Sequence, residues 1–498
     1  MRCNIICGGP AGQGPNFLAR IISQGLVKEG YFVFCSREYE SRIRGGHNYN
    51  TITFSDKPIN SNASEIDILV TLDNLSLEFH KTRLNKNSIV LKEEQENISF
   101  AGRVFKLLEI DFSILDNELK KYGNYKENIE EAKKGYAKET RKLSLRKPTS
   151  KNKNYFMSGS EAVALGACKS GMEFYYSYPM TPATAVLFEL AQKESMFNYK
   201  TIELESEIAS INAAVGSAIT GAKAMVGTAG GGFDLMTETL SMIGMAEIPL
   251  VIYLAQRTGP GTGAATLTSQ ADLHAARHSG HGEFPRVVVA PGDPKEAIEK
   301  ISELFYLTQK YRIAGILLSD KHLAESFYCF DERPKIITSK KSIRQGERFS
   351  SYMSDNQKSS TQEPKIIEKI SEEKINKSKF LAKESDKFET FKIHGKKDSK
   401  NIIVGWGSTK GAILDAIAGL DCKFLQVLYI EPLSQKIKSE LSKAKNIILV
   451  ENNSTSQLSE VLAEKTGVII EEKNKILKYD GYPFMSDILV SEIKKRLK

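Results

Sequence analysis

Short apolar runs that end in a glycine- or proline-containing turn and lead into a helical pattern recur along most of this chain. This alternation restricts the possible folds more than any other feature. In the middle of the chain, "EFYYSYP" leads into "TPATAVLFELAQKES", and "KTIELE" leads into "SEIASINAAVGSAITGA". "KAMVGTA" then leads through a glycine run into "FDLMTETLSMIG". Strands that alternate with helices in this way are typical of parallel sheets covered by helices, so the sequence predicts an α/β fold.

The same alternation divides the 498 residues into three α/β blocks and two polar stretches. Residues 1–115 begin with a strand, a glycine turn, a helix and a second strand, which together predict one βαβ unit of a parallel sheet. Residues 155–333 and 399–498 form the other two blocks. We expect the lysine-rich residues 116–154 to be a charged connector, and residues 334–398 to be a polar linker that is either disordered or wrapped over other domains.

The chain carries a small excess of positive charge, with 69 Lys and Arg residues against 61 Asp and Glu residues. Much of this excess lies in the two polar stretches, which favours solvated linker charge over a nucleic-acid-binding surface. A basic surface for an acidic partner or a phosphate-bearing substrate is the alternative.

The six cysteines are scattered and contain no CxxC pair. This spacing argues against a disulfide framework, and we expect a reducing compartment and no iron–sulfur cluster or metal site on this chain. The N-terminus starts directly with a strand pattern, without a signal peptide. The longest apolar runs fall far short of the roughly 20 residues that cross a bilayer. We therefore expect a cytoplasmic protein without a membrane partner.

Two features of the first block indicate anion binding. "GGPAGQG" is a glycine-rich turn between a strand and a helix, where backbone N–H groups can hold a phosphate or another anion. The alternative is a tight turn that needs glycine only for its backbone shape. The second feature is the set Arg37, Arg42, Arg44 and His47, which would clamp phosphates or carboxylates or form a charged interdomain face.

Three loops of the second block, at residues 179–184, 228–233 and 256–270, each follow a predicted strand. The carboxyl ends of parallel strands meet at one edge of a sheet, and ligands bind at that edge. In the first loop, Thr181 is a natural N-cap and Pro182 a natural first helical residue. In the third loop, Arg257 stands near threonines, including Thr262 and Thr266, and suits recognition of a carboxylate.

Glu203, Glu205 and Glu207 come between a strand and a helix of small apolar residues. The helix dipole favours a carboxylate at this junction, so one reading is simple stabilisation of the first helical turn. The other reading is that one carboxylate points into a site, where burial would raise its pKa. The spacing alone does not choose between these readings.

Long motifs in this chain resemble the 2-oxoacid:ferredoxin oxidoreductases. "YPMTPAT", "SEIASINAAVGSA", "GTAGGGFDLMTE", "QRTGPGTG" and "GHGEFPRVVVAPGDP" are similar to the alpha subunit of these enzymes. "GGPAGQG" and "SREYESRIRGGHNYNT" are similar to the gamma domain, and "GWGSTKGAI", "YIEPL" and "VENNSTSQL" to the transketolase-like C-terminal domain. The resemblance implies a gamma domain fused to a thiamine-pyrimidine-binding domain and a C-terminal domain, and it covers nearly the whole chain outside the two polar stretches.

The resemblance also implies a function. The family oxidatively decarboxylates a 2-oxoacid with coenzyme A to acyl-CoA, carbon dioxide and reduced ferredoxin. Its thiamine diphosphate lies between this subunit and a beta subunit, which carries Mg²⁺ and an iron–sulfur cluster. We expect the beta subunit and ferredoxin as partners and 2-oxoglutarate as the substrate. Pyruvate or branched-chain oxoacids are the alternative substrates, and a non-catalytic assembly or regulatory subunit is the alternative role.

Individual roles follow from the resemblance as expectations. Glu207 would hydrogen-bond the aminopyrimidine ring of the cofactor and so act in catalysis. Thr181 would also act in catalysis, close to the cofactor and to the substrate carboxylate, which Arg257 and Thr262 would recognise as well. The other positions that would bind the cofactor are Tyr178, Pro179, Gly230, Gly231 and Gly232. The arginines that would contact coenzyme A or form a subunit interface are Arg37, Arg42 and Arg44.

This sequence departs from the family pattern at several places. Ser160 stands where the family has asparagine, and Ser206 where it has aspartate. The loop "GTGAAT" replaces "STGLPT", and residues 334–398 lack much of the segment expected there. These changes keep the proposed acid, arginine and threonines, and they leave the substrate preference open.

Overall fold

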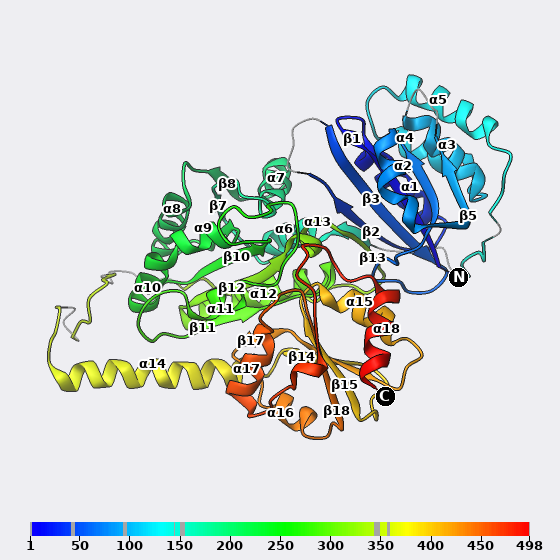
Figure 1. Cartoon of the computed structure of the whole chain (residues 1–498). Coiled ribbons are helices and arrows are strands. Elements are labelled where there is room, and N and C mark those ends of the chain that lie inside the picture. The colour runs from blue at the N-terminus through cyan, green and yellow to red at the C-terminus, as the bar shows by residue number, and fades with distance from the viewer. Residues whose placement is uncertain are drawn as a thin grey trace. The chain divides into compact units, whose positions relative to one another are not determined.

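The computed structural model describes residues 2–40, 45–92, 97–143, 145–149, 155–342, 349–355 and 359–497. The chain divides into two compact units, each described by itself below. The first unit consists of Met1–Ser158, Glu325–Glu332 and Phe484–Ser491, and the second of Gly159–Ala324, Arg333–Pro483 and Glu492–Lys498. Three sheets with flanking helices confirm the α/β class (Figure 1).

The first unit contains a seven-stranded sheet in the order β5-β4-β1-β3-β2-β13-β6. Its strands are β1 (Arg2–Ala11), β2 (Phe32–Glu38), β3 (Gly45–Ser55), β4 (Ile66–Thr71), β5 (Leu84–Leu91), β6 (Tyr155–Ser158) and β13 (Phe327–Phe330). The prediction of a parallel sheet is wrong for this block. Strand β3 lies between β1 and β2 and is antiparallel to both, and only β1, β4 and β5 pair in parallel.

The two short strands β6 and β13 were assigned by sequence to the second block, but they belong to this sheet. Strand β13 pairs antiparallel with both β2 and β6. Backbone hydrogen bonding decides where such four-residue strands pair, and their side-chain pattern is too short to show it.

The helices of the first unit gather over its sheet (Figure 1). They are α1 (Pro15–Lys28), α2 (Asn74–His80), η1 (Lys81–Arg83), α3 (Asn97–Leu107), α4 (Phe112–Leu119) and α5 (Tyr125–Lys138). Helix α1 contacts β1, β2 and β3, and α3 packs on α1. The core between them is lined by Leu18, Ile22, Val33, Ile68 and Phe105, among others.

Helix α5 falls in the segment that the sequence analysis assigned to a charged connector, yet it packs into the first unit. Ile129 and Ala132 are buried in its core. Helices α3 and α5 approach closely because each has a glycine at the contact. A Cβ atom at Gly102 would overlap the Ala132 carbonyl, and one at Gly135 would overlap the Ser99 carbonyl. The lysines on the outer face of α5 conceal this narrow contact in the sequence.

The second unit holds a seven-stranded sheet in the order β17-β11-β12-β10-β9-β7-β8. Its strands are β7 (Phe174–Ser177), β8 (Lys200–Glu203), β9 (Ala224–Thr228), β10 (Leu250–Gln256), β11 (Arg286–Val289), β12 (Ala314–Asp320) and β17 (Tyr429–Glu431). All of them pair in parallel except β17, which is antiparallel to β11. The parallel sheet predicted for this block is confirmed.

The helices of this sheet connect its strands or pack beside it. They are α6 (Gly159–Lys169), α7 (Thr184–Lys193), η2 (Glu194–Met196), α8 (Glu207–Ile219), α9 (Gly230–Leu235), α10 (Thr237–Ala246), α11 (Leu273–His278), α12 (Pro294–Tyr311), α13 (Lys321–Glu325) and α14 (Pro364–Ser385). Helix α14 is the main feature of the segment that we expected to be a polar linker. It reaches the body of the second unit through Tyr306 and Lys310 of α12, which contact Glu384.

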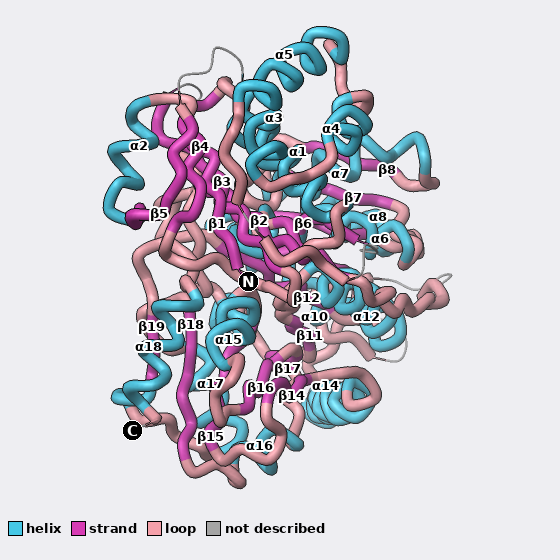
Figure 2. The backbone as a smooth tube through the Cα atoms, turned by 90° about the vertical axis from the view of Figure 1, so that its right-hand side faces the viewer, coloured by secondary structure: helices cyan, strands magenta, loops and turns pink. Residues whose placement is uncertain are grey.

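The third sheet has five strands in the order β14-β16-β15-β18-β19, with α15 against β15 and β16 (Figure 2). The strands are β14 (Phe391–Gly395), β15 (Asn401–Trp406), β16 (Lys423–Val427), β18 (Asn446–Glu451) and β19 (Lys475–Leu477). The helices are α15 (Thr409–Ile417), α16 (Lys436–Leu441), α17 (Gln457–Thr466) and η3 (Glu472–Asn474). The last helix, α18 (Ser486–Arg496), begins within Phe484–Ser491 of the first unit. Strand β14 pairs antiparallel with β16, so this sheet begins before residue 399, inside the segment we expected to be a linker.

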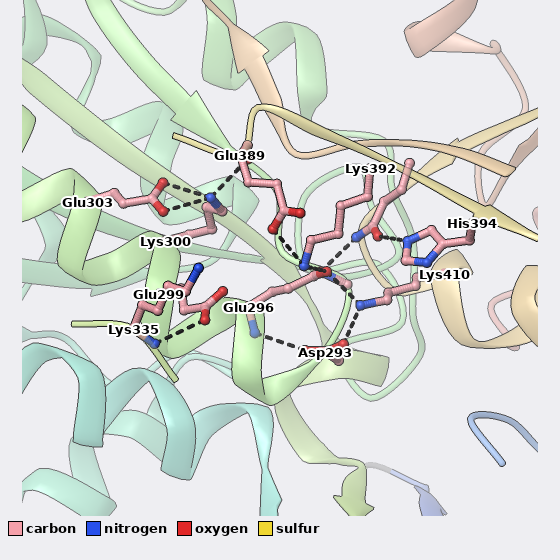
Figure 3. A network of polar contacts seen from close by, with 12 residues as sticks. Asp293, Glu296, Glu299, Lys300, Glu303, Lys335, Glu389, Lys392, His394 and Lys410 are labelled. Atoms are coloured by element: carbon pink, nitrogen blue, oxygen red, sulfur yellow. Dashed lines mark hydrogen bonds and ion pairs between the residues drawn. The ribbon is translucent and has the colours of Figure 1, made fainter. Parts of the chain in front are cut away.

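A buried ionic network fastens α12 to the third sheet (Figure 3). The Glu296 carboxylate is fully buried and accepts hydrogen bonds from Lys410 Nζ at 2.6 Å, Lys392 Nζ at 3.0 Å and Gln426 Nε2 at 2.7 Å. Burial by itself raises the pKa of Glu296, but the two ammonium groups outweigh it and hold the pKa well below its usual value. The carboxylate therefore stays ionised and paired.

We expect Glu296→Ala to lower the free energy of unfolding by about 3–5 kcal/mol at neutral pH, because it removes the fully buried carboxylate that Lys410 and Lys392 share. Each lysine then keeps only a more exposed partner, Asp293 for Lys410 and Glu389 for Lys392. Since the pKa of Glu296 is depressed in the folded state, its contribution is present above about pH 4.3 and is lost as the pH falls toward the folded pKa. Urea unfolding of both proteins at several pH values measures this difference. The control is Glu389→Ala, which removes an exposed partner of the same Lys392 and should cost less than about 1 kcal/mol. Equal effects of the two substitutions would contradict the prediction.

Candidate active site

The candidate site lies at one edge of the second sheet. Strands β7, β8, β9 and β10 are parallel neighbours, so the loops that follow them leave from the same edge. These loops carry Thr181, Glu207, Gly230–Gly232 and Arg257. The structure thus brings together segments that lie up to about 80 residues apart in the sequence.

The first and third loops touch directly. The Arg257 guanidinium donates a hydrogen bond from Nη1 to the backbone carbonyl of Thr181 at 2.8 Å. Its Nε–H is buried and has no hydrogen-bond partner among the described residues. Arg257 therefore has its position set by Thr181 and keeps a donor for another group.

The prediction that Thr181 caps the following helix is wrong. Helix α7 starts at Thr184, and Ala183 occupies the cap position without a side-chain hydrogen bond. The reason is a turn at residues 181–183, in which the Thr184 N–H donates to the Met180 carbonyl at 3.1 Å. Thr181 contributes its carbonyl to the site as the acceptor for Arg257, instead of a hydroxyl to a helix cap.

Glu207 is the first residue of α8, and Ser206 is its N-cap. The Ser206 hydroxyl accepts a hydrogen bond from Ala209 N–H at 3.1 Å, so serine caps the helix at this position as aspartate would. Glu203 and Glu205 are exposed, whereas Glu207 is only 4% exposed. No hydrogen bond to its carboxylate comes from the described residues, and its oxygens are not among the fully buried polar atoms that lack a partner, so a ligand can still supply a donor.

The glycine run at the start of α9 leaves space for the side chains of Glu207 and of Asp272, a residue that precedes α11. A Cβ atom at Gly232 would lie 2.7 Å from Glu207 Cγ and would overlap the Thr228 hydroxyl. A Cβ atom at Gly230 would lie 2.6 Å from Asp272 Oδ2. A Cβ atom at Gly231 would lie 3.7 Å from the Gly261 carbonyl oxygen, an ordinary van der Waals contact, so a methyl group fits at this position.

We expect Gly232→Ala to displace the Glu207 side chain and to destabilise the protein by about 1–3 kcal/mol, because the added Cβ atom would overlap both Glu207 and the buried Thr228 hydroxyl. Gly231→Ala is the matched control in the same helix and should change the melting temperature little. Thermal unfolding of both variants measures the effect. If both variants melt at the wild-type temperature, the close contact between Gly232 and Glu207 is wrong.

Asp272, before α11, is a residue of the site that the sequence reasoning missed. Burial raises its pKa to about 6, the nearby Asp234 adds to the rise and Arg257 opposes it. Its backbone N–H donates to Gln256 Oε1 at 2.9 Å, which fixes the loop after β10. In the sequence, Asp272 is recognisable only as an aspartate just after the loop that follows a predicted strand. Its contact with the glycine run could not be predicted, because the two segments are far apart in the sequence.

Arg257 lies within electrostatic range of two carboxylates. Burial lowers the pKa of Arg257, while Asp272 and Glu207 raise it. The site therefore combines one arginine with two carboxylates at the open end of the sheet. Such a set can bind a carboxylate and hold a proton near a ligand.

The other predicted residues lie around this centre. Tyr178, directly after β7, is 38% exposed, and Pro179 is half-buried. Thr262 is exposed in the loop, which closes through a bridge between Thr258 and Ala264. Thr266, near the end of the loop, is buried.

The predicted arginine cluster belongs to the first unit. Arg37 is on β2, and its guanidinium lies 4.3 Å from the centre of the Tyr39 ring. Arg42 and Arg44 lie outside the described residues. In the described part of the chain, no group of three or more His, Cys, Asp or Glu side chains could hold a metal ion. No helix among the described ranges is long and apolar enough to cross a membrane.

Two family models match the chain. "Pyruvate flavodoxin/ferredoxin oxidoreductase, thiamine diP-bdg" matches residues 165–388, and "Pyruvate ferredoxin/flavodoxin oxidoreductase" matches residues 4–159. The 2-oxoacid:ferredoxin oxidoreductase subunit alpha of Sulfolobus sp is 29% identical over an alignment of 617 residues that covers 100% of this chain and 97% of the relative. Because this chain has 498 residues, that relative carries segments that are absent here.

Two further similarities concern a part of the chain and its fold. The 2-oxoglutarate synthase subunit KorA of Archaeoglobus fulgidus is 38% identical over 173 residues, which are 34% of this chain and 50% of that protein. The solved structure of 2-oxoglutarate:ferredoxin oxidoreductase from Magnetococcus marinus covers 100% of both chains with a TM-score of 0.88 and 23% identity. This structural likeness shows the fold.

The fold and the matched models define a multidomain α/β oxidoreductase subunit with a thiamine diphosphate-binding domain. More particularly, the chain belongs to the alpha subunits of the 2-oxoacid:ferredoxin oxidoreductase family.

Proposed function

We propose that this chain is the alpha subunit, with a fused gamma domain, of a cytoplasmic enzyme that oxidatively decarboxylates 2-oxoglutarate. The reaction joins the acyl group to the coenzyme A thiol, releases carbon dioxide and a proton, and passes two electrons to ferredoxin. The observation that carries this proposal is the buried Glu207 carboxylate without a described donor, facing the glycine run near Arg257. Relatives named 2-oxoglutarate synthase support the choice of substrate.

The residues present fit thiamine diphosphate. When bound, this cofactor supplies a carbon nucleophile and an electron sink for decarboxylation. Glu207 would share a proton in a hydrogen bond with a pyrimidine ring nitrogen and so orient the ring, because the carboxyl group is not engaged by the described residues. Gly231 would let the ring approach the backbone, and Tyr178 and Pro179 would border it.

Arg257 would bind the carboxylate of the oxoacid. Its contact with the Thr181 carbonyl orients the guanidinium, and its free Nε–H can complete a charge-assisted hydrogen bond. Thr262 would contact the same substrate from the loop, and Asp272 would balance the charge of Arg257 before the substrate arrives.

A separate beta subunit would complete the enzyme. We assign to it the Mg²⁺ ion that binds the diphosphate and the iron–sulfur cluster that passes electrons to ferredoxin, because the scattered cysteines of this chain do not suit a cluster. Arg37, Arg42 and Arg44 would contribute to coenzyme A binding or to a subunit interface.

The test is co-expression of the chain with its beta partner, followed by an assay of viologen reduction that depends on both oxoacid and coenzyme A. We expect the highest kcat/KM with 2-oxoglutarate in a panel that includes pyruvate and branched-chain oxoacids. A higher kcat/KM with another oxoacid would correct the substrate. Absence of activity with every oxoacid, in a complex that binds thiamine diphosphate, would favour a non-catalytic assembly or regulatory subunit.

A further inference from the structure

A cavity of about 870 Å³ lies in the second unit, away from the candidate active site. It is bounded by α10, by the residues between α11 and β11, by one face of α14 and by residues of the C-terminal domain. Arg286 at its edge is the first residue of β11, level with Leu250 at the start of β10. Arg257 follows the carboxyl end of β10. The cavity therefore lies at the amino ends of these parallel strands and the candidate active site at their carboxyl ends, about 20 Å apart along the strands.

Helix α14 forms one wall without filling the space beside it. Ser371, Lys374, Ile375, Ser378 and Leu381 line the cavity, and their spacing places them on one helix face. The two serine hydroxyls donate to carbonyls of their own helix. Protein interiors leave few voids larger than a water molecule, whereas ligand pockets measure about 300–1,000 Å³. The two serines on this face of α14 thus leave room for a small organic molecule.

Arg286 is a buried cation without a carboxylate partner of its own. It is only 7% exposed, it stacks over the Phe284 ring at 4.4 Å, and its one hydrogen bond is a long contact of 3.5 Å to the Ala276 carbonyl. Among the described residues it forms no ion pair, and burial lowers its pKa to about 10 although Glu431 opposes this. Glu431 itself accepts hydrogen bonds from Arg277 at 3.2 and 3.3 Å.

Lys374, on α14, offers a second cation to the cavity. Its closest polar contact in the described part of the chain is Met245 Sδ at 3.9 Å. Burial lowers its pKa, and Glu247 opposes the shift. The Glu247 carboxylate, however, is already engaged by Arg312 and Lys377. The neighbouring arginine Arg277 is neutralised by carboxylates, but Arg286 and Lys374 are not.

The remaining cavity lining is mixed, with an apolar part beside polar residues such as Ser241, His278 and Glu464. Met242 and Met245 of α10, Phe284, Met353 and Pro432 contribute to it. Methionine side chains adapt to ligands of irregular shape. Glu238 and Glu283 also line the cavity, but both are exposed at its rim and are solvated.

We propose that this cavity binds a small organic anion, with its carboxylate or phosphate group between Arg286 and Lys374 and its apolar part against Met242, Met245 and Phe284. This proposal does not rest on the proposed catalytic function, because it concerns the opposite edge of the sheet.

The test uses the full-length chain and the fluorescent probe 8-anilinonaphthalene-1-sulfonate, which combines an anion with an apolar body. We expect Ser378→Trp, which fills the cavity from α14, to weaken a saturable component of probe binding at least tenfold. Asn376→Trp is the matched control, because Asn376 is exposed and points away from the cavity face of the same helix. Melting temperatures verify that each variant folds. Lys374→Gln is the second variant, and we expect it to weaken the affinity for the probe at least threefold.

Displacement of the probe identifies the anion. Phenyl phosphate that acts at lower concentration than phenylacetate indicates a phosphate ester, and the reverse order indicates a carboxylate; either result supports the site. Equal probe titrations of the wild type, Ser378→Trp and Lys374→Gln would overturn the proposal. If neutral benzyl alcohol displaces the probe as effectively as phenyl phosphate, the site does not require an anion, which would overturn that part of the proposal. If inorganic phosphate is equally effective, the site does not require an apolar group, which would overturn the other part.

Discussion

Replacing Glu207 with glutamine should lower the kcat of oxoacid-dependent viologen reduction by about a hundredfold to ten-thousandfold in the assembled enzyme. This range is typical for the loss of a positioned acid or base. The amide keeps the size of the side chain but not its proton affinity. Glu207 is only 4% exposed and lies against Gly232, whereas the other carboxylate of the site, Asp272, lies against Gly230, so the two side chains occupy different positions. Steady-state kinetics with saturating oxoacid and coenzyme A measures the change.

Glu205→Gln is the matched control for this prediction. Glu205 lies two residues earlier in the same junction, but it is exposed to solvent. We expect its substitution to leave kcat within about twofold of the wild type, because exposed surface substitutions rarely have large effects. If Glu207→Gln retains full kcat with an unchanged melting temperature, the proposed role of this carboxylate must be abandoned.

Replacing Arg257 with methionine should raise the KM for the oxoacid about 10- to 150-fold. A hydrogen bond to a charged group contributes about 1.5–3 kcal/mol, and each 1.4 kcal/mol corresponds to a factor of ten. The loss should fall mainly on KM, because Arg257 would hold the substrate carboxylate away from the bond that breaks. Initial rates over a range of oxoacid concentrations give both constants.

Arg257→Lys separates charge from geometry. Lysine keeps the positive charge but cannot donate to the Thr181 carbonyl and to a carboxylate through one planar group, so an intermediate KM is expected. The KM for coenzyme A should not change in either variant. An equal rise of both KM values would point to a general disturbance of the loop and against recognition of the oxoacid by Arg257.

Much of the second unit was predictable from local pattern. The apolar runs before Tyr178 and Arg257 became strands β7 and β10, and the loops after them meet at one sheet edge because parallel strands must end together. Glu207 was singled out among the three neighbouring glutamates only through the family resemblance. The structure shows which of the three neighbouring glutamates is buried.

Other features depended on contacts between distant segments. Asp272 joins the site because its carboxylate packs against Gly230, more than 40 residues away. The sequence of helix α5 resembles a charged connector because lysines cover its exposed face. The two glycines that allow its close packing lie on different helices, Gly102 on α3 and Gly135 on α5, so the contact is not visible in the local sequence. Strand β14 is recognisable only from its hydrogen bonds to β16.

The sequence by itself determined the α/β alternation, the strand-end loops and the types of residue that they carry, because these follow from short-range periodicity and from backbone preferences of glycine and proline. Only the tertiary structure decided that Thr181 offers its carbonyl to Arg257, that Glu207 is buried against Gly232, and that Arg286 faces a cavity without a carboxylate of its own. Hydrogen bonds, burial and charge pairing between remote residues depend on which segments meet in space, and local sequence does not encode those distances.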